Sequence, residues 1–253
     1  MNPVIVRNVK IGEGSPKICV PIVAEDEASM EKMAESICGL PVDLVEWRAD
    51  WFQQVFCREK VLAAAGKLRE ILGEIPILFT FRTAKEGGEK AIAPEDYEAL
   101  NLAVAESGYV DLIDVEAFTG DETVRRIIDG AHACGVKVVA SNHDFAKTPP
   151  KEELVCRLCR MQEMGADIPK IAVMPRCRRD VLTLLAATLE MSEQHADTPV
   201  ITMSMASDGV ISRLAGEVFG SALTFGAAGR ASAPGQIGVE DLKQVLEIIH
   251  ESR

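Results

Sequence analysis

The chain has 253 residues, of which 47% are hydrophobic, and this is enough to bury a sizeable core within one domain. Its formal net charge of -12 argues against a general nucleic-acid binder, because neutralising phosphates requires clustered lysine and arginine side chains. No apolar run approaches the roughly 20 residues that cross a membrane, and the first residues do not resemble a secretion signal. We therefore expect a cytoplasmic protein with a single domain over residues 1–253 that binds neither nucleic acid nor membranes.

Short runs rich in valine and isoleucine recur along the chain, and they read as buried strands. They begin at residues 17, 43, 76, 109, 135, 166, 199 and 221. Between them, apolar residues spaced three and four apart predict amphipathic helices over 94–107, 121–134, 151–164, 179–194 and 239–252. Eight strands alternating with helices predict a closed (β/α)8 barrel, that is, a TIM barrel. The stretch before the first strand predicts a small N-terminal hairpin that closes the barrel floor.

A doubly wound open sheet is the alternative arrangement for such a strand and helix pattern. The first strand is followed by VAEDEASMEKM rather than by a G-x-G-x-x-G turn, and the chain contains no G-x-x-x-x-G-K-[ST] loop. Both observations favour the barrel.

The seven cysteines are odd in number and scattered, which favours free thiols over a disulfide framework. Cys156 and Cys159 form a C-x-x-C pair, but they lie inside a periodic segment rather than just after a strand. We therefore expect these two cysteines to pack a helix rather than to act as a redox pair. No further ligands stand at a spacing that suits zinc.

Several of the predicted strands carry polar side chains late in the run, where the active site of a barrel lies. Because alternate residues of a strand face inward, the pairs that share a face are Glu46 with Arg48, Thr80 with Arg82, and Ser141 with His143. A solvated strand end would explain any one of these residues. Their recurrence on several strands predicts that they converge at one mouth.

Lys170 stands in the middle of GADIPKIAVMP, which otherwise reads as a buried strand. Burial and positive neighbours such as Arg48 and Arg82 would disfavour the ammonium form and leave a neutral amine. A neutral amine is a nucleophile toward carbonyl groups, so we predict that Lys170 forms an imine with a substrate ketone. A structural lysine paired with a carboxylate is the alternative.

An imine acidifies the neighbouring C–H group, so the chemistry needs a base. His143 lies one predicted strand before Lys170, and its imidazole is suited to take a proton and return it to a leaving group. Glu86, in the loop after the third strand, is expected to orient the imidazole. A solvated loop carboxylate is the alternative for Glu86.

Donors for an anionic substrate group follow the last two strands. Arg213 comes after the seventh strand, and Ser232 and Gln236 come after the eighth. A guanidinium fork with hydroxyl and amide donors suits a carboxylate, and the small residues of the last loop suit a lid that closes over the mouth. A phosphate cradle is the competing interpretation, because loops after these strands often bind phosphate in barrels.

Six stretches of the sequence resemble type I 3-dehydroquinate dehydratases, in the same order and nearly end to end. They are VEWRAD at 45–50, FTFRTAKEGG at 79–88, SNHDF at 141–145, PKIAVMP at 169–175, ISRLAGEVFGSALTFGA at 211–227 and ASAPGQI at 231–237. The resemblance implies a (β/α)8 barrel, usually a homodimer, without a metal or an organic cofactor. It also implies dehydration of 3-dehydroquinate to 3-dehydroshikimate in the shikimate pathway.

The same resemblance assigns roles to individual residues. Lys170 matches the lysine that forms the imine, His143 the general acid/base, and Glu86 the carboxylate that holds the histidine. The other matched positions bind substrate: Glu46, Arg48 and Arg82 at its hydroxyls and polar ring edge, Arg213, Ser232 and Gln236 around its carboxylate, and Met203 and Met205 as an apolar wall. Ordinary barrel packing is the alternative for the two methionines.

Two segments depart from the family pattern near the expected mouth. MPRCRRD at 174–180 is unusually basic and contains Arg176, Cys177, Arg178 and Arg179, while SMASDG at 204–209 contains Asp208. We expect both segments to leave the chemistry in place, and loop closure, substrate affinity and pH optimum are not transferred from relatives.

Two rival functions remain open. A class I aldolase also uses a barrel lysine imine but cleaves a carbon–carbon bond, and a catalytically silent barrel would only bind carboxylated ligands. The histidine one strand before the lysine, together with the loop that carries Arg213, favours the dehydratase.

Overall fold

A ring of eight parallel strands forms the centre of the computed structural model, which describes residues 2–229 and 236–253. The strands are β3 (Lys17–Ile22), β4 (Leu44–Arg48), β5 (Ile77–Thr80), β6 (Leu112–Glu116), β7 (Lys137–Asp144), β8 (Ile168–Val173), β9 (Ile201–Ser204) and β10 (Leu223–Ala227). Each strand from β3 to β8 pairs in parallel with the next one along the chain, and β10 pairs with β3. A two-residue strand, β11 (Ile237–Gly238), adds to the other side of β10.

The ring closes between β9 and β10 through a short bridge. Val200 pairs with Ser221, and the Ala222 N–H donates a hydrogen bond to the Val200 carbonyl oxygen at 2.8 Å. The predicted (β/α)8 barrel is therefore confirmed, and the alternative of a doubly wound open sheet is wrong.

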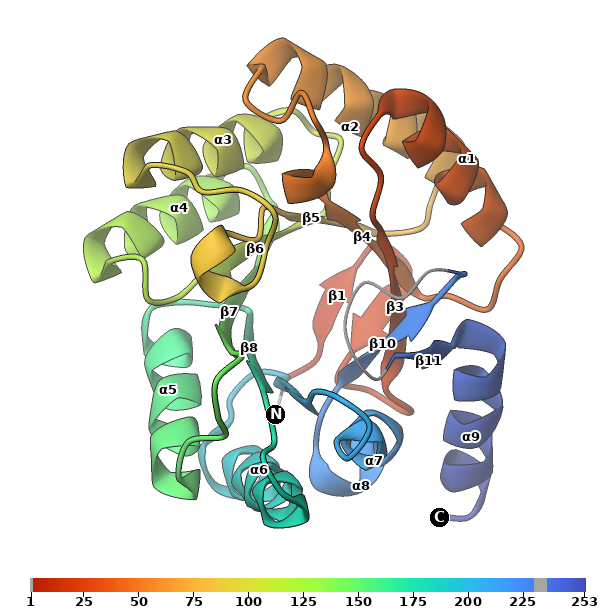
Figure 1. Ribbon diagram of the computed structural model, residues 1–253, viewed down its shortest axis with the longest axis vertical. Helices are drawn as coiled ribbons and strands as arrows, with labels where there is room; N and C mark the ends of the chain where they lie inside the picture. The colour runs from red at the N-terminus through yellow and green to blue at the C-terminus, as the bar shows by residue number, and fades with distance from the viewer. Residues whose placement is uncertain (1, 230–235) are drawn as a thin grey trace.

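Helices surround the ring of strands (Figure 1). They are α1 (Glu27–Ile37), α2 (Arg58–Leu72), α3 (Pro94–Glu106), α4 (Asp121–Ala133), α5 (Lys151–Glu163), α6 (Arg178–Glu190), α7 (Val210–Leu214), α8 (Gly216–Phe219) and α9 (Val239–Glu251). Local signals set several helix starts: the Asp26 side chain caps α1 by accepting from the Ser29 N–H at 2.8 Å, and α3 begins at a proline. All five helices predicted from apolar spacing are present, with ends that differ by a few residues at most.

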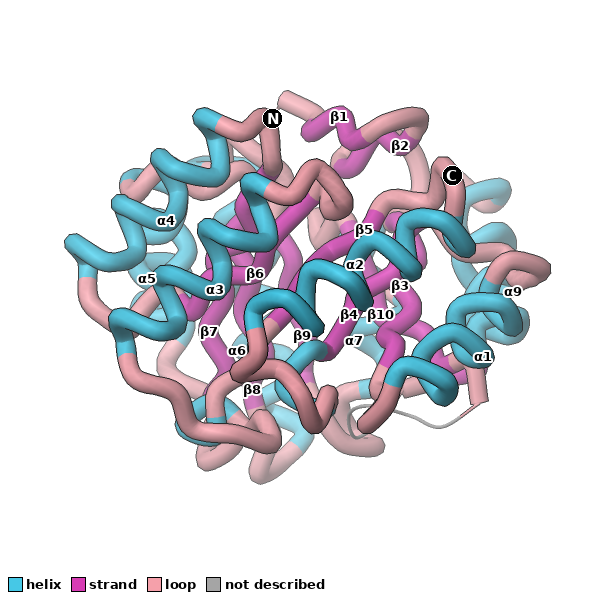
Figure 2. Tube along the Cα trace, turned by 90° about the horizontal axis from the view of Figure 1, so that it is seen from above, coloured by secondary structure: helices cyan, strands magenta, loops and turns pink. Residues whose placement is uncertain are grey.

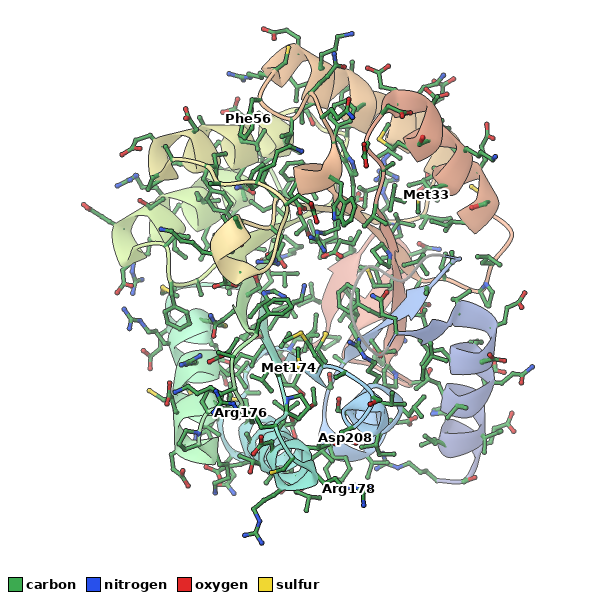
Figure 3. The ribbon with its side chains drawn as sticks, viewed as in Figure 1. Met33, Phe56, Met174, Arg176, Arg178 and Asp208 are labelled. Atoms are coloured by element: carbon green, nitrogen blue, oxygen red, sulfur yellow. The ribbon has the colours of Figure 1, made fainter. Side chains whose placement is uncertain are left out.

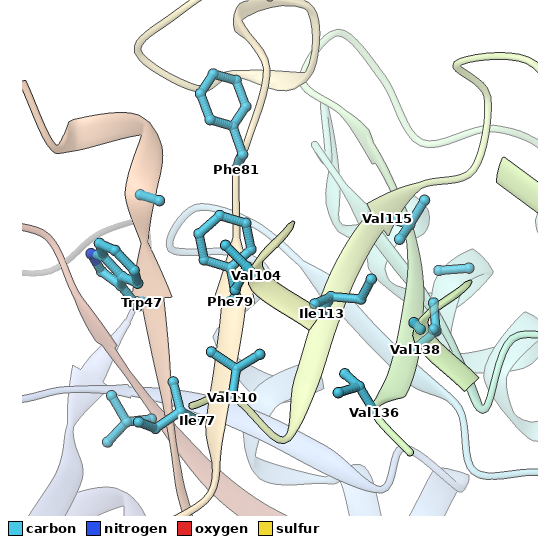
Figure 4. Packing of buried hydrophobic residues seen from close by; sticks show 14 of the residues in the cluster. Trp47, Ile77, Phe79, Phe81, Val104, Val110, Ile113, Val115, Val136 and Val138 are labelled. Atoms are coloured by element: carbon cyan, nitrogen blue, oxygen red, sulfur yellow. The ribbon is translucent and has the colours of Figure 1, made fainter. Parts of the chain in front are cut away.

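The outward-facing side chains of the strands make up the layer between barrel and helices. Trp47 of β4 and Phe79 of β5 pack edge to face, with ring centroids 5.5 Å apart. Figure 4 shows this layer continuing through Ile113 and Val115 of β6. Because every second residue of a strand faces the helices, the remaining side chains of each strand face the barrel interior.

The N-terminal hairpin consists of β1 (Val4–Val6) and β2 (Val9–Ile11), paired antiparallel. It lies at one end of the strands (Figure 2). Its buried residues Val4, Val6 and Ile11 share one apolar cluster with the first inward-facing residues of the strands, such as Leu44 and Leu112. The hairpin therefore covers the amino-terminal end of the barrel, which confirms the predicted floor.

The seven cysteines are free thiols. Cys156 and Cys159 both lie within α5, as predicted, where Cys159 is half-buried against the core and Cys156 is exposed. Across residues 2–229 and 236–253, no cluster of three histidine, cysteine, aspartate or glutamate side chains is arranged to hold a metal ion. No helix in the same part of the chain has the length and apolar character needed to cross a bilayer.

Candidate active site

On five of the strands, the barrel interior changes from apolar to polar between one inward-facing residue and the next. Leu44, Leu78, Leu112, Val139 and Ile168 belong to the apolar cluster at the floor. The next inward positions are polar on five strands: Glu46, Thr80, Asp114, Ser141 and Lys170, all of them buried. One more step along the strands places Arg48, Arg82, Glu116 and His143 at the carboxyl ends, so the polar residues converge as predicted.

A cavity of about 210 Å³ opens at this end of the barrel. It is lined by ten of the eleven residues singled out from the sequence: Glu46, Arg48, Arg82, Glu86, His143, Lys170, Met203, Met205, Arg213 and Gln236. Ser232, the eleventh, lies outside the described residues. Gly87, Phe145, Ala172 and Phe225 complete the lining, and the sequence analysis named none of these four.

Lys170 lies at the bottom of this cavity and is only 3% exposed. Its Nζ is 3.1 Å from Asp114 Oδ2, 3.7 Å from Glu46 Oε1 and 4.7 Å from the centre of the Phe225 ring. The carboxylate partner named as the alternative for Lys170 is therefore present, and it coexists with an open cavity beside the amine.

His143 is held by Glu86 through two contacts to one carboxylate oxygen. Glu86 Oε2 lies 3.0 Å from His143 Nδ1 and accepts a hydrogen bond from the His143 backbone N–H at 2.9 Å. Asn142 donates to the other oxygen, Oε1, at 3.1 Å. The Glu86 carboxylate is thus hydrogen-bonded to two residues of β7, Asn142 and His143, and the alternative of a solvated loop carboxylate is wrong.

The protonation of this pair suits a base. Burial, with smaller contributions from Arg82, Lys170 and Arg48, lowers the pKa of His143 well below its usual value of 6.5. Burial raises the pKa of Glu86 to about 7, against the opposing effect of Arg82. The imidazole is therefore neutral near pH 7 and can take a proton.

The loop that carries Glu86 is tied closely to the strand before it. Thr83 pairs with Lys90, and the Gly88 N–H donates to the Thr83 carbonyl oxygen at 2.9 Å. A Cβ atom added at Gly88 would lie 1.9 Å from the backbone oxygen of Arg82, so only glycine fits at this position. The close approach fixes Glu86 relative to Arg82.

Two arginines at the mouth are anchored by carboxylates. Arg48 makes a two-pronged contact with the buried Asp50, with both N–O distances at 2.8 Å. Arg82 donates from Nη2 to Asp114 Oδ1 at 2.7 Å and from Nη1 to Glu116 Oε1 at 3.1 Å. These contacts fix the positions of the two guanidinium groups that line the cavity.

Sequence reasoning missed Asp114 and Glu116, although it had recognised their strand. Both are at most 1% exposed, and Glu116 also accepts from the Thr83 N–H at 2.7 Å and from the Thr83 hydroxyl at 2.8 Å. The period of two in YVDLIDVEA was the available signal, because it places Leu112, Asp114 and Glu116 on the same face of β6.

The opposite wall of the cavity combines a cation with apolar groups. Arg213 of α7 is 2% exposed, and burial lowers the pKa of its guanidinium to about 10. Its Nη1 lies 3.7 Å from the sulfur of Met203, and Met205 is buried beside the same cavity. Gln236, the residue just before β11, also lines the cavity.

The two segments that depart from the family pattern lie on the rim. Figure 3 shows Arg176 and Arg178 near the start of α6 and Asp208 near α7. Arg176 donates from Nε to the Ala146 carbonyl oxygen at 2.9 Å, and Asp208 is exposed. Arg176, Arg178 and Asp208 do not line the cavity formed by the described residues, whereas Met205 of the second segment does.

Comparisons with known proteins identify the family of the chain. Residues 18–253 match the family model described as type I 3-dehydroquinase. The chain is 58% identical to a 3-dehydroquinate dehydratase of Listeria monocytogenes, over 99% of both chains, and 58% identical to one of Escherichia coli, over 100% of both. A crystal structure of the type I 3-dehydroquinate dehydratase of Clostridium difficile, with covalently modified comenic acid, covers 100% of both chains at 53% identity and a TM-score of 0.98. The chain belongs to the type I 3-dehydroquinase family.

Proposed function

We propose that the cavity dehydrates 3-dehydroquinate to 3-dehydroshikimate through an imine on Lys170. The observation that carries the proposal is a buried amine facing a cavity that also contains a neutral imidazole held by a carboxylate. This combination provides a nucleophile for a ketone and a base for the neighbouring C–H group. The family membership of the whole chain supports the same reaction.

The reaction proceeds in steps that conserve atoms and electrons. Lys170 Nζ attacks the ketone carbon, and the carbonyl oxygen leaves as water with uptake of one proton from solvent, which gives a protonated imine; the final hydrolysis releases that proton. His143 removes a proton from the adjacent carbon, and the electron pair of that bond forms an enamine. The enamine electrons then expel the hydroxyl group of the next carbon, and His143 returns its proton so that water leaves. Hydrolysis of the conjugated imine releases the enone and regenerates Lys170, with net loss of one water.

Binding is assigned to the remaining lining residues. Arg213 and Gln236 provide donors for the substrate carboxylate, and Ser232 is assigned to the same group from the family resemblance. Glu46, Arg48 and Arg82 bind the hydroxyl groups and polar ring edge, where acceptors and fixed guanidinium groups are both present. Met203 and Met205 form an apolar wall against the ring.

The proposed chemistry needs no metal or organic cofactor, because the protonated imine itself withdraws the electrons that the C–H cleavage releases. From the family resemblance we also propose that the protein works in the cytoplasm as a homodimer. The covalent modification named for the Clostridium difficile relative supports a nucleophilic group in that family.

The deciding experiment is borohydride reduction in the presence of 3-dehydroquinate, followed by peptide mapping. We expect one reduced adduct on the peptide that contains Lys170, together with growth of enone absorbance in the absence of borohydride. Lys170→Ala should lose both signals, because no other lysine lines the cavity among the described residues.

Each rival function predicts a different result in the same experiment. A silent binding barrel would give no covalent adduct with the native protein. A class I aldolase would leave 3-dehydroquinate unchanged and release an aldehyde fragment from a sugar phosphate. Either outcome would overturn the dehydratase proposal.

A further inference from the structure

We propose that Asp114 is a positioning residue for this reaction, whose carboxylate fixes the Lys170 nitrogen and acts as counter-ion to the protonated imine. The inference rests on the proposed imine function of Lys170. Asp114 acts through the lysine rather than on the substrate, because it does not line the cavity.

The contacts of Asp114 place it directly beneath the amine. Its Oδ2 lies 3.1 Å from Lys170 Nζ, while Oδ1 accepts from Arg82 Nη2 at 2.7 Å and from the Ser141 hydroxyl at 2.6 Å. The side chain is fully buried. Three donors, from Arg82 just after β5, from Ser141 of β7 and from Lys170 of β8, therefore hold one carboxylate at the centre of the barrel, with Oδ2 directed at the reacting nitrogen.

Asp114 remains ionised in this position. Burial acts to raise the pKa of its carboxyl group, but the opposing effects of Arg82, Lys170 and the Ser141 hydrogen bond leave that pKa below its usual value. A permanent negative charge next to Nζ is consequently part of the site at any pH near neutrality.

The chemistry gives this charge a use. Condensation of the Lys170 amine with a ketone takes up one proton and yields water and a protonated imine, whose nitrogen carries a positive charge. A protonated imine has one N–H, which can donate to Oδ2 at the position where Nζ already contacts it. Asp114 therefore keeps the imine protonated, and a protonated imine withdraws electrons from the adjacent C–H group more strongly than a neutral one.

Other charged and titratable groups face this pair from every side of the barrel. They are Cys19 of β3, Glu46 and Arg48 of β4, Arg82 after β5, Glu86 of the following loop, Tyr97 of α3, Glu116 of β6, His143 of β7 and Arg213 of α7. Only Glu46 joins Asp114 in an ion pair with Lys170 among the described residues, and its oxygen is farther away, at 3.7 Å.

Glu116 provides a matched control two residues along the same strand. It is buried like Asp114 and also contacts Arg82, but its carboxylate otherwise accepts from the Thr83 N–H and hydroxyl, and among the described residues it forms no ion pair with Lys170. Replacing either carboxylate by its amide disturbs Arg82, and only the change at Asp114 removes the anion beside the reacting nitrogen.

The experiment compares Asp114→Asn and Glu116→Gln with the native enzyme. Enone formation is followed from pH 6 to pH 10, and borohydride trapping is measured at pH 9. Removing the counter-ion disfavours the protonated imine, so the alkaline limb of the kcat profile of Asp114→Asn should move to lower pH by about one unit or more, with less trapped adduct. Glu116→Gln should raise KM through Arg82 while its alkaline limb stays in place.

An unmoved alkaline limb in Asp114→Asn, or an equal shift in Glu116→Gln, would overturn the inference. If Asp114→Asn fails to fold, Ser141→Ala takes its place. Loss of the Ser141 donor leaves the carboxylate charge less neutralised, so the limb should move to higher pH by a few tenths of a unit, and no movement would again overturn the inference. Absence of any Lys170 adduct in the native enzyme would instead contradict the proposed function.

Discussion

The two ends of the barrel interior are built by the same strands and differ in almost every property. At the floor, inward residues such as Leu78 and Val139 are apolar and are covered by the N-terminal hairpin. Two residues further along those strands, Thr80 and Ser141 take part in a buried network of hydrogen bonds and ion pairs. A shift of about 7 Å along a strand therefore separates a region that stabilises the fold from a region that performs chemistry.

This division explains how the fold can contain so many buried charges. Several charges at the mouth have an oppositely charged partner, as Arg82 has in Asp114 and Arg48 has in Asp50, and these pairs offset part of the desolvation cost. The apolar floor and the outer layer between strands and helices provide the hydrophobic burial that offsets the remainder. Mutations at the two ends should consequently affect different measurements.

The largest effect is expected from His143→Ala at the mouth. Loss of the base should lower turnover by about 10²- to 10⁴-fold while the imine on Lys170 still forms. Enone formation measures the first effect, and borohydride trapping measures the second. Equal loss of adduct in His143→Ala and Lys170→Ala would contradict the separate roles of the two residues.

A floor substitution should show the opposite pattern. Leu112 is fully buried in the floor cluster, and Leu112→Ala should lower the free energy of unfolding by about 2–5 kcal/mol through lost burial and a residual cavity. At temperatures where the variant is folded, its KM should equal that of the native enzyme. Urea unfolding and steady-state kinetics check the two parts, and a changed KM with unchanged stability would contradict the division.

A smaller, pH-dependent effect is expected from Glu86→Gln. Because the pKa of Glu86 rises from 4.5 to about 7 on folding, the folded state binds more protons than the unfolded state between these values. The stability that Glu86 contributes is therefore fully present below pH 4.5 and is lost as the pH rises to 7. Glutamine does not titrate, so the native protein should lose about 1–3 kcal/mol relative to Glu86→Gln between pH 4 and pH 8.

Unfolding curves for both proteins at these two pH values check this prediction. His143 has the opposite linkage, because its lowered pKa contributes stability that is present above pH 6.5 and is lost as the pH falls below that value. It is present in both proteins, so the comparison reports Glu86 together with its coupling to His143. A stability difference that does not change with pH would show that Glu86 is already ionised near pH 5.

The sequence predicted the barrel because each strand and helix has its own local pattern, and eight repeats of that pattern leave few arrangements. Lys170 was visible for the same reason, since a charge within an apolar strand is conspicuous. Asp114 was missed because YVDLIDVEA contains three acidic residues and nothing local distinguishes Asp114 from the other two. Its partners Arg82, Ser141 and Lys170 are 32, 27 and 56 residues away in sequence. Partner identity and protonation depend on three-dimensional distances, which no local pattern contains.

The close contact between Gly88 and the backbone of Arg82 has a consequence for redesign. Residues 82 to 90 form one closely packed turn, and a methyl group at position 88 would clash with the backbone oxygen of Arg82 and displace the turn. Anyone who transplants this histidine–carboxylate pair into another scaffold must carry the whole nine-residue segment around Glu86 together with the strand that holds His143, rather than graft two side chains.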